Sequence, residues 1–85
     1  MEQTIIVTGG AGFIGSNFLL QWLATERTPV INLDKLTYAG NLNNLESIAL
    51  NPLYRFIQGD ILDRGLVREL LRRERPRAIV HFAAE

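Results

Sequence analysis

Short apolar segments alternate with helical patterns along this chain. The apolar segments cover residues 4–8, 30–34, 54–58 and 78–83, and the first and last are nearly continuous apolar runs. Runs of this kind are typical of parallel strands that are buried on both faces. We therefore predict four strands, which right-handed crossovers would arrange in the order 3-2-1-4.

Three helical patterns separate the predicted strands. The first covers residues 13–24 and has a wide apolar surface, and a shorter second one covers residues 42–49. The third extends from about Asp63, a candidate N-cap, to the stop at Pro76. Strands that alternate with helices indicate an α/β fold, here a Rossmann-type parallel sheet with flanking helices.

Glycines spaced three residues apart lie where the first strand meets the first helix: Gly9, Gly12 and Gly15. We expect Gly9 to let the backbone turn sharply, Gly12 to let it approach a ligand closely, and Gly15 to let the helix pack tightly on the sheet. The helix N-terminus offers N–H groups and partial positive charge to a phosphate. The arrangement predicts a site for the pyrophosphate of a dinucleotide; the alternative is a glycine-rich turn without a ligand.

Further candidate site residues follow the other predicted strands. Asp34 closes the second strand, where a carboxylate can accept hydrogen bonds from both hydroxyls of an adenosine ribose and repel a 2′-phosphate. The alternative is a helix-cap or turn aspartate. Lys35 is either a contact of the ribose region or a solvated cation. The small residues Ala83 and Ala84 would leave room for the inner ribose of the cofactor, or serve core packing alone.

The composition limits the classes of function. The chain has 85 residues, a formal net charge of zero, one histidine and no cysteine. Neutral charge argues against nucleic acid or an anionic membrane as the main partner. Disulfides and thiolate metal sites are excluded, and a single histidine argues against a zinc site. No stretch reaches the length of a membrane span, and we expect a cytoplasmic protein.

Two sets of titratable residues are interpreted as structural. His81, within the last strand, is interpreted as a packed, hydrogen-bonded core histidine. Five arginines near the end of the third helix alternate with glutamates and are interpreted as a solvated face, whose cations complement the helix dipole. They are Arg68, Arg72, Arg73, Arg75 and Arg77.

The pattern ends at the fourth strand. A dinucleotide fold has two halves, and these elements make up the first half and one strand beyond the point where the strand order reverses. We expect this strand to present an unpaired apolar edge, and the chain to be the N-terminal piece of a longer NAD-binding domain. Reductases with this type of fold use a Tyr-x-x-x-Lys pair for catalysis. This pair is absent here, because Tyr38 and Tyr54 are followed four residues later by Leu42 and Gln58. We therefore assign no catalytic residue.

Several runs of residues resemble a known family across the whole chain. Thr8-Gly9-Gly10-Ala11-Gly12-Phe13-Ile14-Gly15-Ser16-Asn17 resembles the extended short-chain dehydrogenase/reductase family. The run Asn32-Leu33-Asp34-Lys35-Leu36-Thr37-Tyr38-Ala39-Gly40-Asn41-Leu42 is more specific, and is similar to the branch of that family that dehydrates dTDP-glucose. Gly59-Asp60-Ile61 and His81-Phe82-Ala83-Ala84-Glu85 fit the same branch.

The resemblance implies a cofactor, a substrate and a set of contacts. The cofactor would be NAD and the substrate of the intact protein would be dTDP-glucose. The intact protein would be a homodimer. Asp60 would contact the adenine amino group and Ile61 the adenine ring, unless Asp60 is an ordinary turn or cap residue. The other implied NAD contacts are Phe13, Ile14, Asp34, Lys35, Leu36, Thr37, Phe82, Ala83, Ala84 and Glu85.

The resemblance also implies a reaction. Enzymes of this branch oxidise the sugar C4 hydroxyl, eliminate water across C5 and C6, and return the hydride to C6, so that NAD is regenerated. Their catalytic residues follow the segment that corresponds to Ala83-Ala84-Glu85. Two alternatives remain open, a nucleotide-sugar epimerase of the same family and a dinucleotide-binding module without chemistry.

Overall fold

The computed structural model describes residues 4–10, 12–35 and 42–82 of the chain. Its strands are β1 (Ile5–Thr8), β2 (Val30–Asp34), β3 (Tyr54–Gln58) and β4 (Ala78–His81). Its helices are α1 (Phe13–Thr25), the 3-10 helix η1 (Leu42–Ile48) and α2 (Arg64–Glu74). The order of elements agrees with the prediction, and the shorter second helix is a 3-10 helix. The predicted end of the last strand, Ala83, lies outside the described residues.

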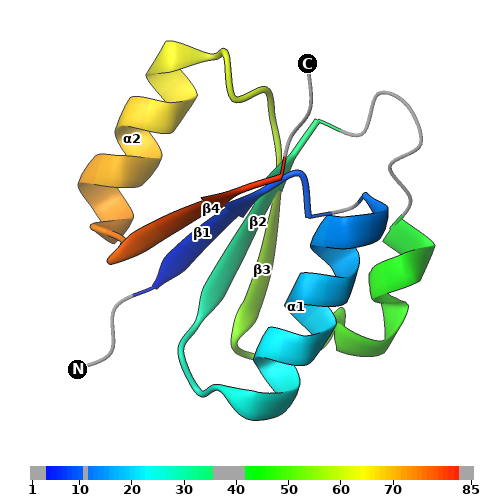
Figure 1. Cartoon of the computed structure of the whole chain (residues 1–85). Coiled ribbons are helices and arrows are strands. Elements are labelled where there is room, and N and C mark those ends of the chain that lie inside the picture. The colour runs from blue at the N-terminus through cyan, green and yellow to red at the C-terminus, as the bar shows by residue number, and fades with distance from the viewer. Residues whose placement is uncertain (1–3, 11, 36–41, 83–85) are drawn as a thin grey trace.

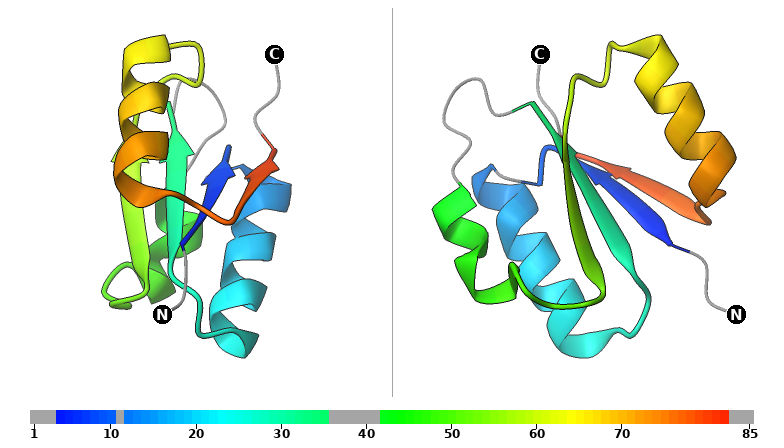
Figure 2. Two further views of the ribbon diagram at one scale, coloured as in Figure 1. Left: turned by 90° about the vertical axis from the view of Figure 1, so that its left-hand side faces the viewer. Right: turned by 180° about the vertical axis from the view of Figure 1, so that it is seen from behind.

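All strand pairs are parallel, and the strands lie in the order β3-β2-β1-β4. This is the predicted order. Helix α2 covers one face of the sheet, and α1 and η1 cover the other (Figures 1 and 2). The molecule therefore has three layers, as expected for strands that are joined by helical crossovers.

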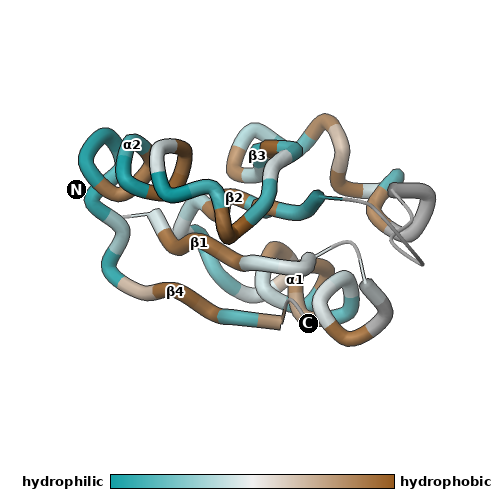
Figure 3. Tube along the Cα trace, turned by 90° about the horizontal axis from the view of Figure 1, so that it is seen from above, coloured by the Kyte–Doolittle hydropathy of each residue, from teal (hydrophilic) through white to brown (hydrophobic). Residues whose placement is uncertain are grey.

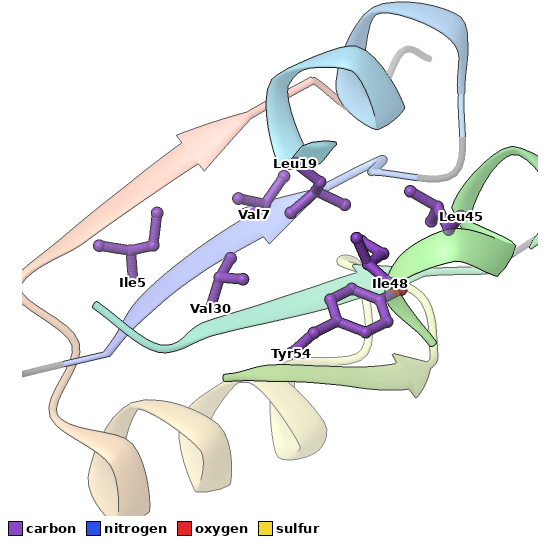
Figure 4. Close-up of a cluster of buried hydrophobic side chains, with 7 residues drawn as sticks. All are labelled: Ile5, Val7, Leu19, Val30, Leu45, Ile48 and Tyr54. Atoms are coloured by element: carbon purple, nitrogen blue, oxygen red, sulfur yellow. The ribbon is translucent and has the colours of Figure 1, made fainter. Parts of the chain in front are cut away.

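Each face of the sheet has its own hydrophobic core. On the side of α1 and η1, strand residues such as Ile5 and Val30 pack with Leu19 and Leu45 (Figure 4). On the other side, Ile6, Ile31 and Leu33 pack with Leu70 of α2. Successive residues of a strand point to opposite faces, and every residue of β1 and β2 is buried because both faces are covered. In Figure 3, brown stretches mark the hydrophobic residues of β1 and β2, which lie between α2 and α1.

Helix α2 begins and ends with recognisable caps. The Asp63 side chain accepts a hydrogen bond from the Leu66 N–H at 3.1 Å, which confirms Asp63 as the N-cap. The helix ends at Arg75, which has a φ of 46°. The five arginines predicted to form a solvated face are exposed. Within the described ranges, no helix is both long and apolar enough to cross a membrane.

Strand β4 differs from the prediction that it is buried on both faces. Three of its four residues are exposed, and the Ile79 side chain retains 51% exposure. His81 is exposed as well, so its interpretation as a packed core histidine is wrong. It is hydrogen-bonded, since its Nδ1 atom lies 2.6 Å from the Thr8 hydroxyl oxygen. The physical reason is position: β4 is the outermost strand of the described sheet, and it pairs with β1 alone.

Candidate dinucleotide site

The carboxyl ends of the four parallel strands meet at one edge of the sheet. The N–H groups of Gly9, Gly59 and Phe82 follow β1, β3 and β4, and each donates to a carbonyl of a neighbouring strand, at 3.0, 3.1 and 2.8 Å. Segments far apart in the sequence are thereby held side by side. Ligands of open α/β sheets bind at this edge, near the point where the strand order reverses.

The glycine loop connects β1 to α1 at this edge. Gly9 has a φ of 74°, a conformation that side chains disfavour, so the sharp turn predicted there is confirmed. Among the described residues, a Cβ atom on Gly12 would meet only the Gly9 carbonyl oxygen, at 3.5 Å, which is an ordinary van der Waals distance. A Cβ atom on Gly15 would collide with the Gly9 carbonyl and lie 2.8 Å from the Gly10 Cα atom. Gly15 therefore lets the first turn of α1 pack tightly against the backbone directly after β1, and whether it also packs on the sheet itself stays a prediction.

The N-terminus of α1 faces the same edge. The Ser16 N–H donates to the Gly12 carbonyl at 2.8 Å, and the earlier N–H groups of the first turn have no carbonyl partner within a helix. No acidic side chain lies in this turn to compete for those donors. Phe13 begins the helix, and the Ile14 side chain retains 66% exposure. The turn can therefore receive an anion such as a pyrophosphate.

Charged residues follow β2 and β3. Asp34 ends β2 and is 4% exposed. The Lys35 ammonium lies 3.3 Å from the Asp60 carboxylate, and both side chains are partly exposed. Asp60 also accepts a hydrogen bond from the Leu62 N–H at 2.8 Å. This backbone bond, followed by the Lys35 interaction, lowers the pKa of Asp60. Asp60 therefore makes the turn that was its alternative role, and its contact with an adenine stays a prediction.

Two apolar candidates lie on opposite faces of the sheet. Ile61 is half-buried and lines a small cavity of about 50 Å³ between the sheet and α2. The Phe82 ring packs against Phe18 of α1, with 5.5 Å between ring centroids. Five further candidates lie outside the described residues, namely Leu36, Thr37, Ala83, Ala84 and Glu85.

One residue of the site was missed by the sequence reasoning. Asn32, in the middle of β2, is fully buried and accepts a hydrogen bond from the Gly10 N–H at 2.9 Å. Its amide nitrogen donates to the Tyr54 hydroxyl at 3.2 Å. Burial raises the pKa of Tyr54, and the Asp34 carboxylate also raises it. The hydrogen bond with Asn32 lowers the pKa but does not cancel the effect of burial. A polar amide within an otherwise apolar strand was the available signal, since buried polar groups need partners.

The strand order, the glycine loop and the exposed helix N-terminus define the first half of a Rossmann-type dinucleotide-binding fold. A family model described as GDP-mannose 4,6 dehydratase matches residues 6–85. The chain belongs to this family of nucleotide-sugar dehydratases. The resemblance inferred from its sequence motifs is therefore confirmed.

Individual relatives share this part of the sequence and structure. The chain is 51% identical to a dTDP-glucose 4,6-dehydratase of Neisseria gonorrhoeae, over 99% of this chain and 24% of the relative. It is similar to the crystal structure of a dTDP-glucose 4,6-dehydratase from Bacillus anthracis in complex with NAD. That match has a TM-score of 0.91 and 48% identity, and covers 98% of this chain and 27% of the other.

An epimerase is also similar. The match to the UDP-Glc/GlcNAc 4-epimerase of Campylobacter jejuni has a TM-score of 0.85 and 38% identity, and covers 98% of this chain and 25% of the other. The chain spans about a quarter of the length of the curated relatives that it matches.

Proposed function

We propose that this chain forms the NAD-binding part of a dTDP-glucose 4,6-dehydratase. The observation that carries the proposal is the glycine loop. Gly9 takes its left-handed turn, and a Cβ atom at Gly12, the N-cap of α1, would contact only the Gly9 carbonyl oxygen among the described residues. A pyrophosphate fits such a cradle because backbone N–H groups and the helix dipole both favour an anion there. The relative from Bacillus anthracis, described as a complex with NAD, supports the choice of cofactor.

Each part of the sheet edge then has a role. The loop and the first turn of α1, with Phe13 and Ile14, hold the pyrophosphate. Asp34 accepts hydrogen bonds from the adenosine ribose hydroxyls, and Lys35 and Asp60 stand beside it as an ion pair. Asp60 and Ile61 contact the adenine, and Leu36, Thr37 and the segment from Phe82 to Glu85 complete the site. NAD, when bound, supplies the acceptor and later the donor of a hydride.

For the whole protein we propose the conversion of dTDP-glucose to dTDP-4-keto-6-deoxyglucose. The chain would hold and orient the cofactor, while the catalytic tyrosine, lysine and carboxylates would come from sequence beyond the matched segment. We further propose a cytoplasmic homodimer. Relatives whose names state this activity are 51% identical, whereas the epimerase match has 38% identity, so a dehydratase is favoured over an epimerase.

The proposal is tested with a chimera. Residues 1–85 of this chain replace the matched N-terminal segment of the Neisseria gonorrhoeae dehydratase, and NAD binding and dTDP-glucose turnover are measured. We expect both to be retained, because the replaced segment would have the same fold and the same cofactor contacts. A folded chimera that does not bind NAD would contradict the proposal.

A second chimera serves as the matched control. The same residues replace the matched segment of the Campylobacter jejuni epimerase, and epimerase turnover is measured. We expect a larger loss of activity than in the dehydratase chimera. If the epimerase chimera alone were active, the chain would belong to an epimerase, and the dehydratase assignment would be wrong.

A further inference from the structure

We propose that Asn32 is a positioning residue that sets the shape of the glycine loop before the cofactor binds, with the Tyr54 hydroxyl holding its amide in place. The inference rests on the proposed binding of NAD, because it assigns a role within that site. It concerns a residue of the inner strand β2, which contacts the loop through the Gly10 N–H.

The hydrogen bonds of Asn32 fix its orientation. Its amide oxygen accepts from the Gly10 N–H at 2.9 Å, and its amide nitrogen donates to the Tyr54 hydroxyl at 3.2 Å. The Gly10 N–H can only donate, so a rotated amide would place two donors against each other. The Tyr54 hydroxyl can accept the hydrogen bond that the Asn32 amide nitrogen donates. Both bonds are buried, where an unmade hydrogen bond is most costly.

The loop is seated closely on this amide. A Cβ atom on Gly10 would lie 2.6 Å from the Asn32 Cγ atom and 2.7 Å from the Leu19 Cδ1 atom. No side chain fits at position 10 without displacing one of these neighbours. Gly10 therefore allows the backbone of the loop to lie directly on the interior of β2.

The network joins the loop to the centre of the sheet. Asn32 is paired in register with Val7 of β1 and Phe56 of β3, so it cannot shift without disturbing both neighbouring strands. Tyr54 is at the start of β3 and packs in the core beneath η1. The contact of the loop with Asn32 therefore restricts the movement of the loop, because Asn32 is held between β1 and β3, although the loop itself lies at the edge of the sheet.

Two consequences follow for the cofactor. The Gly10 N–H is already engaged by Asn32, so it is not among the donors available to the pyrophosphate. The loop is also held in shape before binding, which reduces the loss of conformational freedom on binding. Without the Asn32 amide, the loop would have an unpaired N–H and more conformations available to it.

The test uses the dehydratase chimera and three variants, Asn32→Ala, Tyr54→Phe and Ile31→Val. Ile31 is the matched control, because it is fully buried in the same strand and belongs to the core on the opposite face of the sheet. The two measurements are NAD affinity by calorimetry and, without NAD, hydrogen exchange of the peptide that contains Gly10.

We expect Asn32→Ala to weaken NAD binding by about tenfold, the loss of roughly one buried hydrogen bond, and to speed exchange of the loop peptide. Tyr54→Phe should change both measurements in the same direction and by less, and it keeps the test open if Asn32→Ala does not fold. Ile31→Val should leave both unchanged. The exchange measurement distinguishes a local loosening of the loop from a general loss of stability, because only the local effect leaves the exchange rates of distant peptides unchanged.

The outcomes distinguish this inference from the proposed function. Unchanged affinity and exchange in the Asn32 and Tyr54 variants would overturn the inference alone. An equal effect of Ile31→Val would also overturn it, since Asn32 would then act only through stability. If the unmutated chimera bound no NAD, the proposed function would fail, and an unchanged exchange rate in Asn32→Ala would still overturn the positioning role.

Discussion

At the scale of single residues, we propose that Asp34, at the end of β2, determines which dinucleotide binds. Asp34 is 4% exposed and is the last residue of the strand, directly before Lys35 and its ion pair with Asp60. A carboxylate at this position matches two ribose hydroxyls, whereas a 2′-phosphate would bring negative charge against it. The net effect should be a preference for NAD over NADP, even with one lysine nearby.

Asp34→Ala should narrow that preference. A charge-assisted hydrogen bond contributes about 1.5–3 kcal/mol, so the ratio of NADP to NAD dissociation constants should fall by roughly tenfold or more. Calorimetric titration of the chimera with each dinucleotide measures the ratio. Lys35→Ala is the matched control and should not narrow the preference for NAD. Equal affinities for NAD and NADP before mutation would contradict the role of Asp34.

Gly12 offers a substitution that separates binding from folding. Its Cβ position has only an ordinary contact at 3.5 Å, so Gly12→Val should leave the strands and helices folded while filling the space that the pyrophosphate needs. NAD binding should be lost with little change in thermal stability. Gly15→Ala should instead lower the melting temperature, because its Cβ position overlaps the backbone of the loop. Undiminished NAD affinity in Gly12→Val would exclude the loop as the pyrophosphate site.

The candidate residues were predictable to different degrees. Asp34 and Asp60 could be predicted, because the ends of parallel strands meet at one edge and each aspartate follows a readable strand. The Asn32 network could not, because Asn32 bonds to Gly10 and Tyr54, each 22 residues away, and which way its side chain points depends on register. The exposure of His81 could not be predicted either, because it depends on whether another element packs beside β4, and the local apolar pattern does not indicate this.

At the scale of elements, one ion pair joins a strand to the helix that covers it. Arg55 of β3 lies 2.7 Å from Glu74 at the end of α2, and Arg73 adds a second contact at 3.1 Å. The hydrogen bond from Arg55, followed by that from Arg73, lowers the pKa of Glu74 below its ordinary value. The pair therefore makes the docking of α2 on the sheet sensitive to acid.

The sign of this sensitivity follows from the lowered pKa. The folded state favours ionised Glu74, so its contribution to stability is present above the unfolded pKa and is lost as pH falls through the folded pKa. Glu74→Gln should be less stable than the unmutated chain at pH 7, by less than about 1 kcal/mol, because the half-exposed Arg55 side chain leaves the pair screened by solvent. The difference should shrink below pH 4.5, the ordinary value for this group. Thermal unfolding across this range measures it, and a difference that grew on acidification would contradict the assignment.

The elements themselves were largely predictable, and their burial was not. Apolar runs and the Asp63 cap marked the strands and α2, since these signals are local. Strand β4 has the same apolar character as β1, yet Ile79 is half exposed while the corresponding residue of β1, Ile6, is 3% exposed. Composition alone cannot distinguish them, because burial is set by the neighbouring layers rather than by the strand.

At the scale of the whole molecule, the described residues provide binding groups without a catalytic base. Tyr54, at the start of the edge strand β3, is buried beside Asn32, and Gln58 follows it at the position where a lysine would be needed. The isolated chain should therefore show no turnover of dTDP-glucose, and should bind NAD more weakly than the chimera, because it supplies only part of the binding crevice. Assays of the two proteins side by side measure both properties. Turnover by the isolated chain would overturn this prediction.

The isolated chain should also associate with itself through β4. Within the sheet of described residues this outer strand pairs with β1 alone, and Ile79 adds an apolar side chain that is 51% exposed. Edges of this kind pair with other chains unless they are charged or covered. A chain of this size buries only about 60–65% of its unfolded surface, so little stability opposes rearrangement of the edge.

A charge on that edge should prevent the association. Ile79→Lys should shift the isolated chain toward a monomer, because a lysine would bring an unpaired charge between two adjoining edges. Leu50→Lys is the matched control, since Leu50 is 97% exposed in the turn after η1, away from β4. Solution mass measured over a range of protein concentrations distinguishes them. A mass that stayed monomeric for the unmutated chain, or that fell equally in both variants, would mean that β4 is not the surface through which the chains associate.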